Sequence, residues 1–286
     1  MRFIGVASKM FKDEYISSRS NPTVKWAASL SEKKGREAAK SFIAEGEKLT
    51  LEALGASLPV SHVFICESYR ERIIGKLNEA LDPKKHKDVR IITLSDSAFE
   101  KISTEKSPQG VISVIKHLDF FSIIDIIYKK EFFLDENERA IALCSVRDPG
   151  NLGSVIRSAV AFGVDRIILS SDCADVYNPK TVRSAMGSLF KVKISVVSDM
   201  HGFIEAAKEN GRRVFAAELT DRAIPLSEAA LTSRDIIIIG NEGHGIPKDI
   251  SALSDSSVYI PISQKTESLN ASVAAAIFIW EQSKQA

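Results

Sequence analysis

The stretch Asp235-Ile-Ile-Ile-Ile-Gly-Asn-Glu-Gly-His-Gly-Ile-Pro247 decides the fold class of this chain. Its four consecutive isoleucines are typical of a strand buried on both faces, as in a parallel sheet covered by helices. Three glycines follow within six residues, and glycine tolerates positive φ and lets a ligand approach the backbone closely. Open α/β sheets bind ligands outside the carboxyl ends of their strands. The stretch therefore predicts a central strand whose loop, with Glu242 in its middle, borders a ligand site.

Apolar runs that suit strands recur on both sides of this stretch and alternate with helical patterns. In the second half of the chain six such runs predict a doubly wound α/β sheet, with strands expected at 140–146, 166–170, 192–197, 213–217, 236–239 and 258–261. Four earlier strands, expected at 41–44, 60–66, 89–94 and 110–115, predict a smaller α/β domain. Residues 116–138 break the alternation. We therefore divide the chain into an N-terminal domain of residues 1–117, a linker of 118–138 and a second domain of 139–286.

The composition is that of a soluble globular protein. Of its 286 residues 44% are hydrophobic and 26% charged, and the net charge of +1 argues neither for nor against a nucleic-acid partner. No apolar run reaches the roughly 18 residues of a membrane-spanning helix, and the N-terminus lacks a signal-peptide core, so we expect neither. The three cysteines and five histidines are too scattered to predict a disulfide framework or a metal site. A reducing cytoplasm fits this composition.

Polar residues follow four of the expected strands, at the edge where a doubly wound sheet binds ligands. The helix after the first strand begins near Asn151, and its apolar stripe leaves Arg157 on the opposite face. The other three loops carry Glu218, Glu242, and Ser268 with Asn270. The chain has no G-x-x-x-x-G-K-S/T phosphate loop, no G-x-G-x-x-G fingerprint and no credible Ser–His–Asp set, which argues against several common enzyme classes.

Three motifs in the second domain together resemble those of one enzyme family. They are Asn151-x-Gly153-x-x-x-Arg157, then Ile239-Gly-Asn-Glu-Gly-His-Gly-Ile246, and then Ile260-Pro-Ile262 with Ser268-Leu-Asn-Ala-Ser-Val-Ala274. In this order and at these separations they look like the motifs of the SpoU (TrmH-type) RNA 2′-O-ribose methyltransferases of the SPOUT superfamily. Residues 178–190 resemble the segment between the first two motifs, and 42–48 and 107–111 resemble the family's auxiliary substrate-binding domain.

The resemblance implies an S-adenosyl-L-methionine-dependent enzyme that methylates a ribose 2′-hydroxyl in RNA. It implies a C-terminal methyltransferase domain with a trefoil knot, and a homodimer whose active sites lie near the subunit interface. The apolar final helix, expected at residues 269–282, is a candidate for the dimer contact, with the core of its own subunit as the alternative. Ribosomal RNA is the expected substrate because an auxiliary domain precedes the catalytic one, and transfer RNA is the alternative. A non-enzymatic RNA-binding ribosome-assembly protein of the same fold is a second class of function.

The resemblance also implies where the cofactor lies. It is expected on Gly240, Ile260 and Leu269, largely through backbone groups and apolar contact. Glu218 and Leu219, which follow the fourth strand of the second domain, are expected to border the adenine.

The resemblance further implies a set of catalytic residues. Arg157 is expected to activate the ribose hydroxyl, held in place by Asn151, Glu242, Ser268 and Asn270. A guanidinium is a poor base in water, with a pKa above about 12, so we expect it to polarise the hydroxyl or bind the adjacent phosphate. Proton acceptance stays open. Structural alternatives exist: Asn151 and Ser268 suit helix N-caps, Glu242 suits a lysine pair, and Arg157 suits a solvated helix face.

Basic residues in two places are candidates for contacts with RNA phosphates. They are Lys180 and Arg183, between the first two motifs, and Lys25, Lys33 and Lys34, near the N-terminus. The N-terminal group also includes Arg36 and lies in a helical region expected to begin with Asn21 as cap and Pro22 in the first position. For any one of these cations a solvated surface position is the alternative. The sequence identifies neither the RNA nor the nucleotide.

Overall fold

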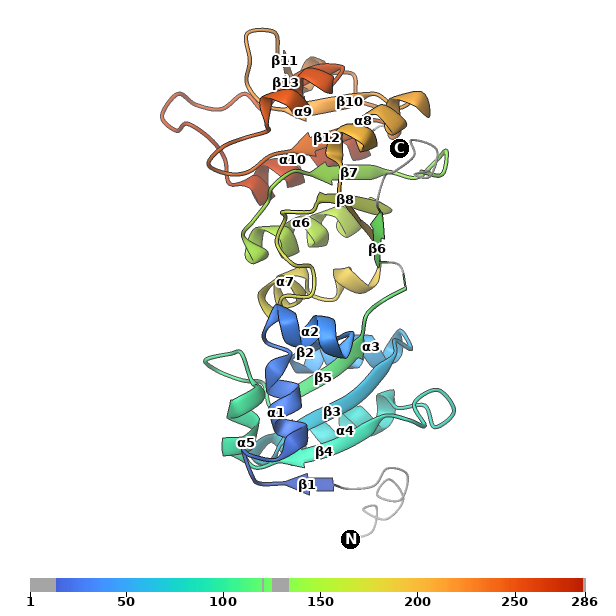
Figure 1. Cartoon of the computed structure of the whole chain (residues 1–286), viewed down its shortest axis with the longest axis vertical. Helices are drawn as coiled ribbons and strands as arrows, with labels where there is room; N and C mark the ends of the chain where they lie inside the picture. The colour runs from blue at the N-terminus through green and yellow to red at the C-terminus, as the bar shows by residue number, and fades with distance from the viewer. Residues whose placement is uncertain (1–13, 120, 125–133, 285–286) are drawn as a thin grey trace. The chain divides into compact units, whose positions relative to one another are not determined.

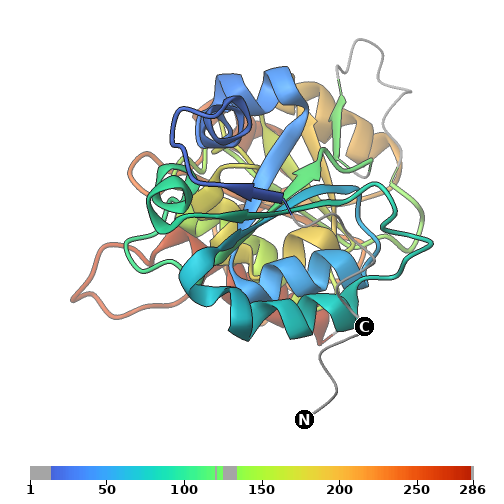
Figure 2. The same cartoon turned by 90° about the horizontal axis from the view of Figure 1, so that it is seen from below.

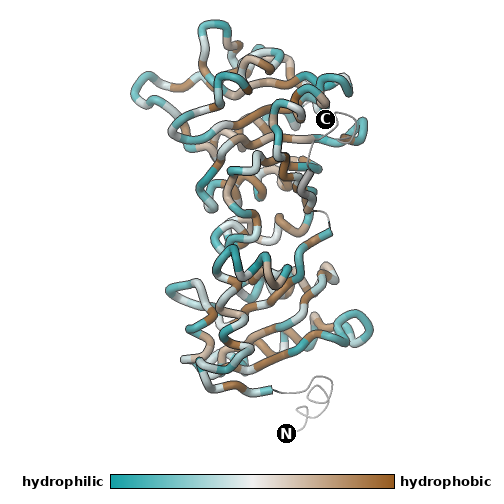
Figure 3. Tube along the Cα trace, viewed as in Figure 1, coloured by the Kyte–Doolittle hydropathy of each residue, from teal (hydrophilic) through white to brown (hydrophobic). Residues whose placement is uncertain are grey.

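The computed structural model describes residues 14–119, 121–124 and 134–284, which form two compact units (Figure 1). The first unit contains the described residues up to Leu118 together with Tyr177–Phe190. The second contains the described residues of Asp119–Val176 and those from Lys191 onward. Hydrophobic residues follow the strands of each unit, whereas the connecting loops are mostly hydrophilic (Figure 3).

A five-stranded sheet forms the centre of the first unit. Its strand order is β1 (Glu14–Ile16), β4 (Arg90–Leu94), β3 (Val60–Cys66), β5 (Val111–Lys116) and β2 (Ser41–Glu45). Helices α1 (Pro22–Ser29) and α5 (Asp96–Ile102) share a buried hydrophobic core with one face of this sheet. Helices α3 (Glu47–Gly55) and α4 (Arg70–Ala80) lie together on the other side (Figure 2). The predicted small α/β domain is therefore confirmed.

The first N-terminal helix begins where the sequence predicted, whereas one arginine of the second helix does not lie on the predicted surface. The side chain of Asn21 accepts a hydrogen bond at 2.8 Å from a backbone N–H in the first turn of α1, and Pro22 is the first helical residue, as predicted. In the next helix, α2 (Lys33–Ala39), Arg36 is buried rather than on the surface. Its guanidinium donates to the carbonyl oxygens of Leu30 and Ser31, because this connection between the helices leaves those acceptors without partners of their own.

The segment Tyr177–Phe190, which includes α7 (Pro179–Ala185), belongs to the first unit, whereas the sequence pattern suggested one continuous second domain of residues 139–286. The buried ring of Tyr177 stacks on the rings of Phe42 and His117, with a centroid separation of 4.5 Å in each case. Its hydroxyl oxygen accepts a hydrogen bond from the backbone N–H of Leu118 at 2.9 Å. These aromatic contacts hold the segment to residues that are distant in the sequence.

A parallel sheet of eight strands forms the centre of the second unit. Its order is β11 (Ile224–Pro225), β13 (Ser256–Tyr259), β10 (Val214–Ala217), β12 (Ile236–Ile239), β7 (Ala140–Leu143), β8 (Arg166–Ser170), β9 (Lys193–Val197) and β6 (Phe121–Ile124). Every neighbouring pair is parallel. The predicted doubly wound sheet is confirmed, with β6 and β11 as strands that the sequence pattern did not predict.

Part of the expected linker, residues 118–138, is an edge strand of this sheet. Strand β6 pairs with β9, and the hydroxyl oxygens of Ser122 and Ser195 lie 3.1 Å apart across the pair. Part of this apolar segment therefore pairs with a strand of its own chain. Residues 125–133 of the same segment lie outside the described residues.

The isoleucines of β12 are buried on both faces, as their sequence predicted. Ile236 and Ile238 belong to a hydrophobic core that includes residues of α8 (Met200–Glu209) and α9 (Lys248–Leu253). Because side chains alternate along a strand, Ile237 and Ile239 face the opposite side. There α10 (Ala271–Ser283) packs against β12, and α6 (Pro149–Ala161) lies beside α10. None of the four isoleucines is more than 3% exposed.

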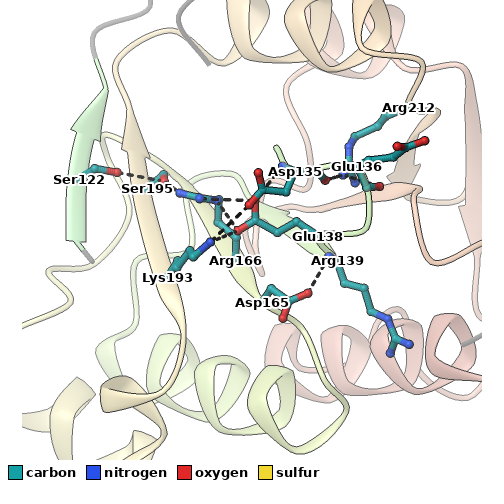
Figure 4. Close-up of polar contacts among 10 residues, drawn as sticks. All are labelled: Ser122, Asp135, Glu136, Glu138, Arg139, Asp165, Arg166, Lys193, Ser195 and Arg212. Atoms are coloured by element: carbon teal, nitrogen blue, oxygen red, sulfur yellow. Dashed lines mark hydrogen bonds and ion pairs between the residues drawn. The ribbon is translucent and has the colours of Figure 1, made fainter. Parts of the chain in front are cut away.

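A network of charged side chains closes the amino-terminal edge of this sheet (Figure 4). The carboxylate of Glu138 is buried and accepts hydrogen bonds from Arg166 Nε at 3.0 Å and Lys193 Nζ at 3.1 Å. Arg166 also donates to the hydroxyl of Ser195 at 2.9 Å. Burial alone raises the pKa of Glu138, but the hydrogen bond from Lys193 and the charge of Arg166 outweigh it and hold the pKa below its usual value.

This network predicts a pH-dependent contribution to stability. Glu138→Gln should lower the free energy of unfolding at pH 7 by roughly 3 kcal/mol, because removing one partner of a buried pair leaves the other uncompensated. Since the folded-state pKa is depressed, the contribution is complete above the unfolded-state pKa of about 4.3 and is lost as the pH falls through the folded-state pKa. Urea unfolding of wild type and variant between pH 3 and pH 7 checks this.

A suitable control is Glu228→Gln, which alters an exposed carboxylate of the same unit. Its unfolding free energy should match that of the wild type at each pH. A gap between wild type and Glu138→Gln that stays constant down to pH 3 would contradict the role given to Glu138.

Candidate functional site

A cavity of about 330 Å³ lies at the carboxyl-terminal edge of the sheet in the second unit. The loops after β10, β12 and β13 and the start of α10 enclose it. Its lining includes all five residues predicted to hold the cofactor, namely Glu218, Leu219, Gly240, Ile260 and Leu269. Two residues predicted to be catalytic, Glu242 and Ser268, also line it. The predicted position of a ligand site at this edge therefore has a cavity of suitable size for a small molecule.

The glycine-rich loop after β12 folds back on itself. The backbones of Asn241 and Gly245 exchange two hydrogen bonds, of 3.0 and 2.9 Å, and Gly245 has a φ of +68°. A Cβ at Gly240 would lie 2.4 Å from the carbonyl carbon of Gly245 and 2.6 Å from the backbone nitrogen of Ile246. Gly240 is therefore required by the close packing of the loop's own backbone, whereas the sequence suggested positive φ or the approach of a ligand as the reason for these glycines.

Side chains from the three motifs meet in one hydrogen-bonded chain beside this cavity. Asn270 Nδ2 donates to Asn151 Oδ1 at 3.0 Å, and Asn151 Nδ2 donates to Glu242 Oε1 at 2.5 Å. Glu242 is therefore bound by an amide rather than by the lysine that the structural alternative supposed. Asn151 and Glu242 are 91 residues apart in the sequence, and Asn151 and Asn270 are 119 residues apart. Their meeting is a property of the fold.

The helix caps differ from the structural alternatives considered for Asn151 and Ser268. Asp148 is the N-cap of α6, and its carboxylate accepts from the backbone N–H of Asn151 at 2.9 Å. Asn270 is the N-cap of α10, and its Oδ1 accepts from the backbone N–H of Ser272 at 2.9 Å. Asn151 and Ser268 are therefore not N-caps, because each helix begins at a different residue from the one expected. Asn270 combines a cap with the contact to Asn151.

Arg157 lies apart from this group. It is exposed on α6, with the side chain among the solvent-facing residues of that helix, and it is not among the residues that line the cavity. Its neighbours Ser154 and Ser158 line a shallow groove with Val273, Ile277 and other residues of α10. Four of the five expected catalytic residues of this chain therefore lie at the cavity or next to it, whereas Arg157 lies on an exposed face of α6.

The carboxylate of Glu218 is held through one of its two oxygens. Its Oε1 accepts hydrogen bonds from the hydroxyl of Ser251 and, at 2.8 Å, from that of Ser257. Leu219 beside it is 77% exposed, which leaves an apolar side chain open to solvent at the rim of the cavity.

The predicted RNA-binding residues all belong to the first unit. Lys180, at the start of α7, is exposed, and so are Lys25, Lys33 and Lys34. Lys33 forms an ion pair of 3.8 Å with Glu37. Arg183 is half-buried and forms an ion pair with Glu105, so it is less available to a phosphate than the sequence suggested.

Some residues at the site were not predicted as functional. Asn241 lines the cavity and holds the glycine-rich loop, since its Oδ1 accepts from the backbone N–H groups of Gly243 at 2.9 Å and His244 at 3.1 Å. Its place directly before Glu242 in the motif was a usable signal. Asp148 was signalled by the Asp-Pro pair, because proline favours the first helical position after a cap.

Within the described residues we find no group of three or more His, Cys, Asp or Glu side chains placed to hold a metal ion. In the same part of the chain, no helix combines the length and apolar character needed to cross a membrane. The thiols of Cys66, Cys144 and Cys173 are free rather than joined in disulfides. Burial is the main cause that raises the pKa of Cys173.

Comparisons with known proteins agree with this geometry. Residues 138–280 match the model of the SpoU rRNA methylase family, and residues 21–113 match the MRM3-like substrate-binding domain. The Bacillus subtilis 23S rRNA (guanosine-2′-O)-methyltransferase RlmP is 30% identical over 93% of this chain and 97% of its own. A Streptomyces viridochromogenes 23S rRNA (uridine-2′-O)-methyltransferase is 28% identical over 94% of this chain and 92% of its own. The crystal structure of an AdoMet-bound rRNA methyltransferase from Sinorhizobium meliloti superposes with a TM-score of 0.77 at 27% identity, covering 95% of this chain and 98% of that one.

The double role of Asn270 can be separated by two substitutions. Asn270→Ala should lower the free energy of unfolding by about 1 kcal/mol, because the N-cap of α10 is lost. Asn270→Asp should keep wild-type stability, since aspartate caps a helix as well as asparagine does but cannot donate to Asn151. Urea unfolding of the three proteins checks this. Equal destabilisation by both substitutions would show that the contact with Asn151, and not the cap, supplies the stability.

Proposed function

We propose that this chain, which belongs to the SpoU rRNA methylase family, transfers a methyl group from S-adenosyl-L-methionine to a ribose 2′-hydroxyl in RNA. One observation carries the proposal: Asn151, Glu242 and Asn270, one from each motif, form a hydrogen-bonded chain beside a cavity at the carboxyl edge of the sheet. The named relatives, which match almost the whole chain, support the same reaction.

The cavity suits S-adenosyl-L-methionine in size and in chemistry. Its volume of about 330 Å³ is in the range of small-molecule sites, and apolar side chains provide much of its lining. Backbone groups at Gly240, Ile260 and Leu269 would hold the cofactor, with Glu218 and Leu219 beside the adenine. When bound, the cofactor supplies an electrophilic methyl group on a sulfonium centre.

The chain's own residues would orient the attacking ribose. Asn270 fixes the rotamer of Asn151, and Asn151 in turn binds Glu242, so their free polar atoms are held beside the cavity. Ser268 lines the same cavity and is exposed to an incoming substrate. Arg157 would polarise the 2′-hydroxyl or bind the adjacent phosphate. Alignment of the reacting atoms by such groups supplies a large share of the rate in two-substrate reactions.

We infer that the enzyme is a homodimer. Val273 and Trp280 on α10 are each 47% exposed, and with residues of α6 they border a shallow apolar groove that a second copy of the same face would cover. Arg157 lies on α6 and not at the cavity of its own copy, so a dimer through this face would bring it towards the active sites. Sedimentation velocity at micromolar concentration tests this. A single species with the mass of one chain would contradict it.

Ribosomal RNA is the substrate that we favour, because the two relatives described above carry 23S rRNA in their names and the matched N-terminal domain is a substrate-binding one. Transfer RNA is the alternative. The exposed cations Lys25, Lys33, Lys34 and Lys180 would contact phosphates, with Arg183 released from Glu105 to join them. We place the enzyme in the cytoplasm, where both substrates occur, and we expect a trefoil knot in its C-terminal domain. Cell fractionation tests the location.

Arg157→Ala tests the proposed reaction most sharply. Methyl transfer from radiolabelled S-adenosyl-L-methionine to ribosomal RNA from cells without the gene should fall by at least about 100-fold. Binding of S-adenosyl-L-methionine, measured by calorimetry, should stay near wild type, because Arg157 does not line the cavity. Asn270→Asp should also lose transfer while keeping its fold.

Arg234→Ala, which removes another exposed arginine of the same unit at the opposite edge of the sheet, is the matched control and should keep wild-type transfer. Retention of most turnover in Arg157→Ala would refute the role of Arg157. A wild-type protein that binds RNA but no S-adenosyl-L-methionine would instead favour the non-enzymatic ribosome-assembly protein.

A further inference from the structure

The loop after β7 contains a residue in an uncommon backbone conformation. Ser145 has a φ of +58°, and among the described non-glycine residues of the second unit it shares a positive φ with Ala230. Such a conformation is disfavoured for residues with a Cβ and persists when the surroundings fix it. Ser145 lies three residues before Asp148, which caps the helix that carries Asn151 and Arg157.

Side chains from two other segments of the chain hold all three polar groups of Ser145. Its backbone N–H donates to Ser170 Oγ at 2.8 Å, and its hydroxyl donates to Asp172 Oδ2 at 2.6 Å. Its carbonyl oxygen accepts from Asn241 Nδ2 at 2.8 Å. The last residue of β8 and the loop after it therefore bind one side of Ser145, and the glycine-rich loop binds the other.

The carboxylate of Asp172 is the anchor of this arrangement. It accepts hydrogen bonds from the hydroxyls of Ser145 and Ser170, each at 2.6 Å, and from Arg147 at 3.1 Å. Partial burial of its otherwise exposed side chain raises the pKa of Asp172, but these hydrogen bonds outweigh it and keep the pKa below its usual value. Asp172 is therefore an ionised acceptor at neutral pH, and charge-assisted hydrogen bonds of this kind are stronger than neutral ones.

Asn241 completes the connection, because the nitrogen and the oxygen of its side-chain amide bind different loops. Its amide nitrogen binds the carbonyl of Ser145, whereas its amide oxygen binds the backbone N–H groups of Gly243 and His244. Glu242, which binds Asn151, lies inside that same turn. The distance between the start of α6 and the glycine-rich loop is thus fixed twice, once through Ser145 and once through Asn151.

We propose that Ser145, held by Asp172 and Asn241, is a positioning residue that sets Asn151 against Glu242. This inference deepens the proposed function and rests on it, since the loops that Ser145 joins are the ones assigned to the cofactor and the ribose. Asp172 acts through Ser145 and touches neither substrate. Substitution of Ser145 or of Asp172 therefore lets the loop after β7 move relative to the glycine-rich loop.

Asp172→Asn is the main test, because it preserves the size of the side chain and removes the charged acceptor. The kcat for methyl transfer to ribosomal RNA from cells without the gene should fall roughly 10- to 100-fold, the usual effect of misplacing a reacting group by about 1 Å. The Kd for S-adenosyl-L-methionine should stay within about twofold of wild type, as expected for a change confined to positioning. Ser145→Ala should behave alike. Asp165→Asn, at the opposite edge of the sheet, is the matched control and should keep wild-type kcat.

A double-mutant cycle with Asn151→Ala separates positioning from general damage. If Asp172 acts through Asn151, adding Asp172→Asn to Asn151→Ala lowers kcat no further, because coupled residues are not additive. An undiminished further loss in the double variant overturns the proposal, and so does a wild-type kcat in both Asp172→Asn and Ser145→Ala.

A crystal structure of Asp172→Asn gives a readout that needs no RNA. We expect the Asn241–Ser145 hydrogen bond to be broken and Asn151 to have moved from Glu242. Retention of both contacts at their present lengths of 2.8 and 2.5 Å overturns the proposal even if the variant is slow. A wild-type protein that methylates no RNA defeats the proposed function instead, and this structural test still decides the inference.

Discussion

Two asparagine amides and one carboxylate hold the candidate site together. The chain from Asn270 through Asn151 to Glu242 joins the start of α10, the first turn of α6 and the glycine-rich loop, which are far apart in the sequence and lie at one edge of one sheet. Asn270 also caps α10, so the same side chain fixes the start of a helix and the orientation of Asn151. An amide suits this position because it donates and accepts at once, whereas a carboxylate or a hydroxyl supplies fewer of the required groups.

In the parallel sheet of the second unit, the charged network and the candidate site lie at opposite edges. At the amino edge the buried carboxylate of Glu138 is neutralised by Arg166 and Lys193, which fixes the ends of three neighbouring strands. At the carboxyl edge the loops are longer and carry exposed polar residues around the cavity. Between the edges, the isoleucines of β12 are buried on both faces, so the strand before the glycine-rich loop is held rigidly. The loops of the site therefore start from fixed points.

The sequence predicted what depends on local pattern. The isoleucine run placed the central strand, the Asn21-Pro22 pair placed a helix start, and the loops after three of the strands placed residues that line the cavity. Motif resemblance identified the family. These predictions succeeded because hydrophobic periodicity and turn chemistry act over a few residues.

The remainder depends on contacts that are distant in the sequence. Residues Tyr177–Phe190 joined the first unit because Tyr177 stacks on Phe42 and His117, which no local pattern signals. Asp148, and not Asn151, caps α6, and the Asp148-Pro149 pair was the local signal that the prediction missed. The conformation of Ser145 could not be predicted either, because side chains at the end of β8 and in the glycine-rich loop fix it.

A crystal structure of the chain with S-adenosyl-L-methionine tests the central claim most directly. The account predicts the cofactor in the cavity, against the backbone of Gly240, Ile260 and Leu269, with Asn151 still bridging Glu242 and Asn270 beside it. A cofactor bound elsewhere on the protein, or a cavity that stays closed to it at saturating concentration, would contradict the account.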